Sequence, residues 1–177
     1  MKLLMTVTDG YEEVEAIGTL AILRRAGLDV TFASLYSSQA TGRYGVHVDG
    51  LVPLSEVDVD DYDMLIIPGG PEYVVEEKDP SFLAMVKKFF EEDKYVAAIC
   101  AGPTILGHLG LLKGRRYTCF TSMDEDFGGT YEDRYVVVDG RLITGRSCAA
   151  SIDFALAIVE TLLGKDKADR LKESIYY

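Results

Sequence analysis

The chain has 177 residues, and its 29 acidic residues against 18 basic ones give a formal net charge of −11. It has neither the roughly 20 consecutive apolar residues of a membrane helix nor a basic stripe, so we expect no membrane and no nucleic-acid partner. The first residues predict a strand and not a signal peptide. Three cysteines without paired spacing favour free thiols, a cytoplasmic location and no structural zinc.

Strands and helices alternate along the chain. The first half predicts a strand over residues 2–8, a helix over 12–26, a strand over 29–35, a small hairpin over 45–53, a strand over 63–68 and a helix over 80–92. The second half predicts a strand over 95–100, a helix to about 112, a strand over 116–120, a hairpin over 134–144, a helix over 149–163 and a charged last helix. The first helix has an apolar face of Val14, Ile17, Leu20, Ala21 and Leu23, and Asp49 and Gly50 form the turn of the first hairpin.

This alternation predicts an α/β fold with a single domain over residues 1–177. The first strand, helix and strand form a βαβ unit, which implies a right-handed crossover and a parallel sheet. We expect a doubly wound sandwich, with a mostly parallel central sheet and helices on both faces. Functional residues of such folds lie at the carboxyl ends of the strands, where the loops after residues 8, 68, 100 and 144 meet.

Cys100 ends an apolar run, and Ala101, Gly102 and Pro103 follow it directly. The pattern predicts a sharp turn from a buried strand into a helix, with the sulfur exposed to helix N–H groups. Such a position lowers a thiol pKa and favours a nucleophile. A cysteine that only packs is the alternative, and we prefer this interpretation for Cys119.

A nucleophilic thiol needs a hydrogen-bonding partner and donors for a developing oxyanion. The backbone N–H groups of Gly70 and Ala101 are candidate donors. Glu15 is the candidate partner, because it lies near the apolar positions of the first helix and a buried carboxyl stays protonated. Glu12 and Glu13 are interpreted as solvated helix residues.

Five segments resemble the ThiJ/PfpI superfamily. They cover residues 11–15, 24–27, 67–70, 98–103 and 153–159, in order over essentially the whole chain. The Glu-Glu-x-Glu and Ala-x-Cys-Ala-Gly-Pro motifs are specific in combination. The chain is most similar to the branch that contains the parkinsonism-associated protein deglycase and bacterial ThiJ-type proteins.

The resemblance implies a flavodoxin-like, glutamine amidotransferase-like fold and a homodimer. It also implies that Cys100 is a reactive, oxidisable cysteine, that a protonated Glu15 contacts it, and that the turn of Gly69 and Gly70 contributes an oxyanion-hole amide. Members of the branch are described as cofactor-free glyoxalases or deglycases of methylglyoxal and its adducts, and as redox-sensing chaperones. An older label connects the branch to thiazole monophosphate and thiamine biosynthesis.

The chain departs from this family in its histidines. Phe120 and Ala101 occupy the positions at which relatives carry a histidine. Of the two histidines present, His47 falls in the small hairpin and His108 lies two helical turns beyond Cys100. We therefore expect no histidine as general base, which disfavours a Cys-His hydrolase.

Cys148 occupies a second departure from the family, because relatives have Gly-Pro-Gly after the arginine at position 146. It comes to the same end of the sheet as Cys100, and a second thiol there would allow a reversible disulfide. Packing at a helix start is the alternative interpretation. Arg43 is interpreted as a turn residue, and the resemblance places it near a dimer interface.

Two functions of different classes remain for this stress-response protein. A cofactor-free enzyme would add Cys100 to a small reactive carbonyl such as methylglyoxal, while Glu15 moves the proton. A redox sensor or redox-regulated chaperone would use oxidation of Cys100 to a sulfinate that Glu15 holds. Thiazole phosphate metabolism ranks third, because the chain has no P-loop and no GxGxxG after a strand.

Overall fold

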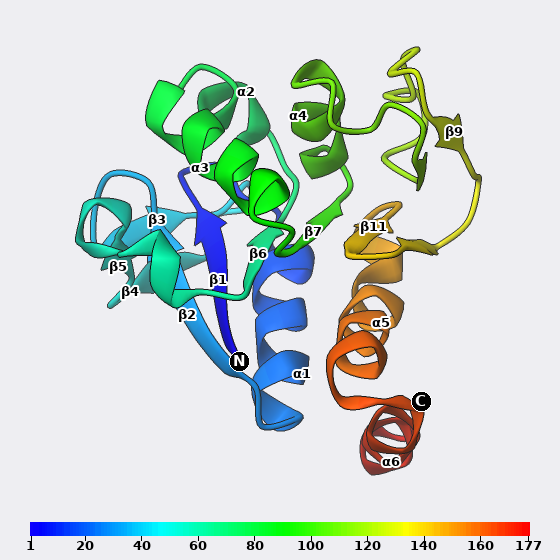
Figure 1. Ribbon diagram of the computed structural model, residues 1–177. Helices are drawn as coiled ribbons and strands as arrows, with labels where there is room; N and C mark the ends of the chain where they lie inside the picture. The colour runs from blue at the N-terminus through cyan, green and yellow to red at the C-terminus, as the bar shows by residue number, and fades with distance from the viewer.

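A seven-stranded sheet forms the centre of the molecule in the computed structural model, which describes residues 1–177 (Figure 1). In spatial order the strands are β10 (Val136–Asp139), β11 (Leu142–Gly145), β7 (Tyr95–Ile99), β6 (Met64–Ile67), β1 (Lys2–Val7), β2 (Asp29–Ser34) and β5 (Val52–Pro53). Neighbouring strands pair in parallel, except that β10 is antiparallel to β11. The expected mostly parallel sheet is confirmed, with an antiparallel edge strand.

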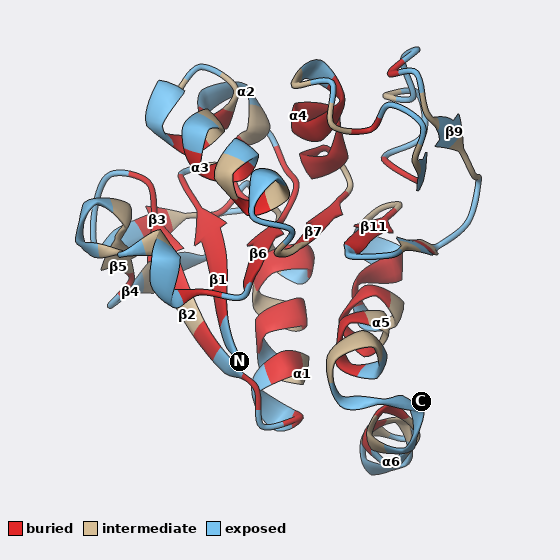
Figure 2. Cartoon of the chain, viewed as in Figure 1, coloured by how far each residue is buried: buried red, intermediate tan, exposed pale blue.

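Helices cover both faces of this sheet. They are η1 (Val14–Gly18), α1 (Thr19–Arg25), η2 (Leu54–Glu56), η3 (Val59–Asp61), α2 (Tyr73–Glu76), α3 (Pro80–Glu91), α4 (Gly102–His108), η4 (Cys148–Ala150), α5 (Ser151–Leu163) and α6 (Lys165–Ile175). One core contains buried residues of α1, α5 and α6, and the other contains those of α3 and α4. Burial is concentrated in the strands and on the sheet-facing sides of the helices (Figure 2). None of the helices combines the length and the apolar character that crossing a lipid bilayer requires.

The alternation of side chains along β1 explains the two cores. Leu3, Met5 and Val7 point into one core and Leu4 into the other, because residues i and i+2 share a face of a strand. β1 lies between β2, which follows it in the chain, and β6, which comes later. The strand order therefore reverses at β1, and a crevice is expected where the loops after β1 and β6 separate.

The first predicted helix begins with a π-helical turn, and this turn changes its buried face. Val14 and Ala21 are exposed, so their assignment to the apolar face was wrong, while Glu15 and Ala16 are buried. The i→i+5 hydrogen bonding of a π-turn rotates side chains away from the α-helical spacing on which the prediction relied. As a result, a carboxyl group points into the protein.

The hairpin predicted over residues 45–53 lies earlier in the chain. β3 (Gln39–Thr41) pairs antiparallel with β4 (His47–Asp49), so the turn covers residues 42–46 and not Asp49 and Gly50. The following strand, β5, joins the main sheet beside β2. The side chain of Glu13 accepts a hydrogen bond from an N–H of the true turn, a contact over 31 residues that no local pattern records.

The strand predicted over residues 116–120 is shorter than expected. Only β8 (Arg116–Tyr117) is a strand, and it pairs with β9 (Thr130–Tyr131) in a separate two-stranded sheet. The N–H of Thr118 donates instead to the hydroxyl of Thr144, at 2.9 Å. The backbone after Tyr117 is therefore bonded to the loops around the carboxyl ends of the strands.

Some helix boundaries also differ from the prediction. α4 ends at His108 and not near residue 112, because Gly110 adopts a φ of 74° and the N–H of Leu111 closes onto the carbonyl of Leu106. The short helix α2 was not predicted. The hairpin predicted over residues 134–144 is confirmed as β10 and β11.

We expect Phe154→Ala to lower the free energy of unfolding by about 3–5 kcal/mol, because this fully buried ring of α5 leaves a cavity in the core. Phe120→Ala is the matched control. Phe120 is 43% exposed, and its loss should cost less than about 1 kcal/mol. Urea unfolding followed by circular dichroism measures both, and equal losses would contradict this packing.

Candidate functional site

Cys100 lies at a strained turn between β7 and α4, as predicted. Its φ of 63° falls in the left-handed region, which a non-glycine residue adopts only under constraint. Hydrogen bonds hold this conformation, because its N–H donates to the carbonyl of Gly145 at 2.9 Å and its carbonyl accepts from the N–H of Phe120 at 2.8 Å. The residue is partly exposed, so its sulfur is accessible from one side.

Glu15 is the partner of this thiol. The π-helical turn η1 buries the Glu15 side chain, which is 1% exposed. Its Oε2 accepts a hydrogen bond from the N–H of Gly69 at 2.9 Å. Its Oε1 is buried without a hydrogen-bond partner, and the Cys100 thiol is the neighbouring side chain that most lowers the pKa of this carboxyl. The sequence-based pairing of Cys100 with Glu15 thus has a geometric basis.

Gly69 makes this approach possible. A Cβ at position 69 would lie 2.5 Å from Oε2 of Glu15 and 2.6 Å from Cβ of Cys100. Any side chain there would push the carboxyl and the thiol apart. The glycine turn after β6 therefore allows the carboxyl of Glu15 and the thiol of Cys100 to lie close together.

Burial controls the protonation of the pair. It raises the pKa of Glu15 to about 7, against the opposing effect of the hydrogen bond to Cys100. Burial also raises the pKa of the Cys100 thiol, and the negative charge of Glu15 raises it further, while the N–H of Ala101 lowers it. The expectation that the turn lowers this pKa was wrong in direction, because desolvation and the neighbouring carboxyl outweigh the backbone donor.

The two expected oxyanion donors lie at the same place. Gly70 adopts a φ of 111°, and its N–H has no acceptor within the chain. Gly70, Ala101 and Cys100 line one pocket of about 260 Å³. An oxygen atom bound next to the sulfur therefore has an unoccupied backbone donor within the pocket wall.

The rest of this pocket is mainly apolar. Pro71, Tyr73, Val74, Phe120 and Met123 line it, together with the cationic side chain of Arg43. A larger hollow of about 350 Å³ between α1, β2 and β4 contains no cysteine and no glutamate. Cys100 lines the smaller pocket, and the carboxyl of Glu15 is buried beside this thiol, so the smaller pocket is the candidate active site.

Glu12 and Glu13 are not simply solvated, in contrast to the expectation. Oε2 of Glu12 accepts from the N–H of Glu15 at 2.8 Å and thereby caps the start of η1. Oε1 of Glu13 accepts from the N–H groups of Tyr44 at 2.6 Å and of Val46 at 3.4 Å. Both carboxyl groups hold backbone that surrounds the site.

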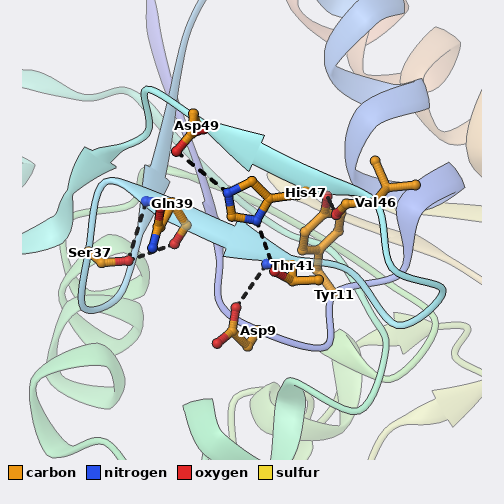
Figure 3. A network of polar contacts seen from close by, with 8 residues as sticks. All are labelled: Asp9, Tyr11, Ser37, Gln39, Thr41, Val46, His47 and Asp49. Carbon is orange, nitrogen blue, oxygen red and sulfur yellow. Dashed lines mark hydrogen bonds and ion pairs between the residues drawn. The ribbon is translucent and has the colours of Figure 1, made fainter.

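Neither histidine reaches the pocket, as expected. Nδ1 of His47 contacts the hydroxyl of Thr41 at 3.0 Å, and Nε2 lies 3.6 Å from the carboxylate of Asp49 (Figure 3). His108 is the last residue of α4, at the opposite end of this helix from Cys100, and its Nδ1 lies 2.6 Å from Oε1 of Glu77. A general base in this pocket would therefore be a group other than histidine.

The other two cysteines differ from Cys100. Cys119 is fully buried, and burial raises its pKa to about 12, in agreement with a core residue. Cys148 is exposed. Partial desolvation of its thiol and the negative charges of Glu12 and Glu15 nevertheless raise the pKa of this thiol. All three thiols are free, and a Cys100–Cys148 disulfide stays a prediction.

The sequence analysis did not identify Glu72 and Glu76 as buried carboxyl groups. Both are fully buried at α2, and the N–H of Thr8 donates to Oε2 of Glu72 at 2.5 Å. Both oxygens of Glu76 lack a partner. Burial raises the pKa of both groups well above the ordinary value, so they are held as acids. Residues 71–79 have the composition of a polar loop, and only the i, i+4 spacing of the two glutamates hints at a shared buried face.

Comparisons with known proteins agree with this geometry. The sequence profile of the DJ-1/PfpI family matches residues 1–161. A deglycase of Thermococcus kodakarensis is 37% identical over 149 residues, which cover 82% of this chain and 90% of the relative. A glutathione-independent glyoxalase of Caenorhabditis elegans is 34% identical over 172 residues, which cover 96% and 92%. The crystal structure of a DJ-1 superfamily protein from Salmonella typhimurium superimposes with a TM-score of 0.93 at 34% identity, over 99% of this chain and 98% of that one.

We expect Glu15→Gln to lower the pKa of the Cys100 thiol, because it removes the negative charge that raises this pKa. Glu12→Gln is the control and should lower it less, since Glu12 is a smaller contributor. The pH dependence of alkylation by iodoacetamide, with the other two cysteines replaced by alanine, gives the thiol pKa. An unchanged or higher pKa in Glu15→Gln would contradict the electrostatic coupling.

We expect Glu76→Gln to make stability less dependent on pH. A carboxyl whose pKa is raised by folding stabilises the protein below its unfolded pKa of about 4.3, and this contribution is lost as pH rises toward the folded pKa. Between pH 5 and pH 8, wild type should therefore lose more unfolding free energy than the variant, by up to about 1.4 kcal/mol per pH unit. Urea unfolding measures this, with Glu91→Gln on α3 as an exposed control, and parallel curves would exclude the effect.

Proposed function

The chain belongs to the DJ-1/PfpI family, and we propose that it is a stress-response protein whose Cys100 and Glu15 convert small reactive carbonyl compounds, such as methylglyoxal and its adducts, without a cofactor. The deglycase and glyoxalase names of its relatives support this chemistry. The observation that carries the proposal is the contact of Glu15 with Cys100 in a pocket where the N–H of Gly70 has no acceptor.

The first step is addition of the thiol to the aldehyde carbon. The carboxylate of Glu15 accepts the thiol proton as the bond between sulfur and carbon forms, and the aldehyde oxygen becomes an oxyanion. The N–H groups of Gly70 and Ala101 are the donors for this oxyanion. Return of the proton from Glu15 to the oxygen gives a neutral hemithioacetal.

The pKa of Glu15 suits both proton transfers. At about 7, it leaves similar amounts of carboxylate and carboxylic acid at neutral pH. A group with this pKa acts as a base toward the thiol and then as an acid toward the oxyanion. Glu15 thus does the work of the histidine that relatives carry at the positions of Phe120 and Ala101.

With a 2-oxo aldehyde as substrate, the remaining chemistry is an internal redox reaction. Glu15 moves the proton of C1 to C2, and the hydroxyl proton on the C1 oxygen passes to the C2 oxygen, so that C1 is oxidised and C2 reduced by the same electron pair. The product of this step is the thioester of a 2-hydroxy acid. Water cleaves the thioester, releases the acid and restores the thiol, so no external oxidant or reductant is consumed.

A redox sensor or redox-regulated chaperone is the second candidate, favoured by the unpaired buried oxygen of Glu15. One peroxide molecule would oxidise Cys100 to a sulfenic acid and a second to a sulfinic acid, and each step releases water. The new oxygen atoms need hydrogen-bond donors. A protonated Glu15 and the N–H of Gly70 are available for this purpose.

A homodimer is part of the same proposal. Val14, Tyr44 and Val46 are exposed, and they lie together because Glu13 bonds to the backbone of the last two. Grouped large apolar side chains of this kind indicate a protein interface, and a second copy of the chain would cover them. The cytoplasmic location stays a prediction that rests on the free thiols.

We expect Cys100→Ala to abolish methylglyoxal conversion, and Glu15→Gln to slow it by about 10²–10⁴-fold, because proton transfer is lost. Cys119→Ala and Cys148→Ala are matched controls that should retain activity. Methylglyoxal consumption and lactate formation are measured together. Absence of turnover in wild type, or unchanged turnover in Cys100→Ala, would reject the enzyme, and a sulfinate at Cys100 under mild peroxide would then favour the sensor.

A further inference from the structure

One side of the pocket at Cys100 is an apolar wall. Val74, Phe120 and Met123 contribute to it. Phe120 is 43% exposed and Val74 is 40% exposed, so apolar surface faces water directly beside the nucleophile. Covering this surface with an apolar ligand group is favourable, because it removes apolar area from water. The wall therefore favours a substrate with an apolar side chain over a very small one.

The lining of the pocket also includes a single cation, Arg43. Its side chain is exposed and forms no ion pair, whereas Arg116, Arg141 and Arg146 each pair with a carboxylate. Arg24, Arg25, Arg115 and Arg170 form no ion pair either, but Arg43 is the one arginine that lines this pocket, so its guanidinium is available to a ligand bound there. A guanidinium binds carboxylates through paired, charge-assisted hydrogen bonds.

The structure holds Arg43 in this place. Its N–H donates to the carbonyl of Tyr11 at 2.8 Å, and the hydroxyl of Tyr11 donates to the carbonyl of Val46 at 2.9 Å. Figure 3 shows Tyr11 lying against the hairpin next to Val46. The guanidinium lies over the ring of Tyr44, 5.5 Å from its centre. Because Tyr11 directly precedes the motif that contains Glu15, the cation and the reactive pair share one support.

We propose that this pocket selects 2-oxo carbonyl compounds that carry both an apolar, ring-sized side chain and a carboxylate. The proposal rests on the proposed function, because it assumes that the carbonyl carbon lies at Cys100. The apolar side chain then covers Val74, Phe120 and Met123, and the carboxylate pairs with Arg43. A dry cavity of about 150 Å³ holds a benzene ring, and the pocket of about 260 Å³ leaves room for the 2-oxo acid as well.

Calorimetric titration of the intact protein tests this selection independently of turnover. The probes are phenylglyoxylate, which has ring, ketone and carboxylate, pyruvate, which lacks the ring, and acetophenone, which lacks the carboxylate. None of them is an aldehyde that the enzyme could consume. Phenylglyoxylate should bind at least about tenfold more tightly than either of the others, since only it engages both sides.

Two variants locate the binding. Arg43→Gln should weaken phenylglyoxylate about tenfold and leave acetophenone unchanged, because only the carboxylate loses its partner. Phe120→Ala should weaken phenylglyoxylate and acetophenone but not pyruvate. Arg25→Gln is the matched control, since this exposed arginine at the end of α1 lies outside the pocket, and it should change nothing.

Equal affinities of wild type for the three probes, or no effect of Arg43→Gln, would overturn the proposal. Its failure is distinguishable from failure of the proposed function. If methylglyoxal turnover depends on Cys100 but the three probes bind equally, the proposed enzymatic function is retained and the proposed selectivity is rejected. Tight phenylglyoxylate binding that depends on Arg43, without any turnover, leaves a binding pocket and removes the enzyme.

Discussion

The burial of one carboxyl group beside one thiol is the constraint on which the rest of the site depends. Glu15 reaches Cys100 because η1 turns its side chain inward and because Gly69 places no side chain between them. Desolvation makes both groups prefer their protonated forms, and the charge of Glu15 raises the pKa of the thiol further. Near neutral pH, the charge of the pocket therefore depends on whether Glu15 is protonated.

The parallel sheet supplies the rigidity that this arrangement needs. Cys100 at φ 63° and Gly70 at φ 111° occupy turns that begin directly after β7 and β6, two paired neighbours. The N–H of Cys100 is bonded to the end of β11, so the strained conformation is anchored on a further strand. A glycine adopts such a φ without steric cost, so the strain of about 1–3 kcal/mol falls on Cys100, and it persists only because the surroundings fix its backbone. The fold thus contributes to the site by holding unfavourable backbone conformations in place.

Local patterns predict those parts of the protein that depend on neighbours in the sequence. The turn at Cys100 is predictable because an apolar run meets Gly102 and Pro103, and the doubly wound sheet follows from the alternation of elements. The parts that escaped prediction depend on distant contacts. Examples are the hairpin turn that Glu13 organises and the burial of Glu72 beneath Thr8. The sign of the thiol pKa shift belongs to the same class, because it depends on how much water the folded chain removes.

The hairpin of β3 and β4, whose turn carries Arg43, is separate from the main sheet. It forms its own two-stranded sheet, and it joins the molecule through the buried Ala40 and through hydrogen bonds to the loop after β1 and to Glu13, whereas the N–H of Cys100 is bonded to the end of β11 in the main sheet. Small, weakly connected units open locally at a lower free energy than the whole domain. On the proposed selection, warming would therefore move Arg43 out of the pocket before it disturbs Cys100, and discrimination between ligands would decline at a lower temperature than thiol reactivity.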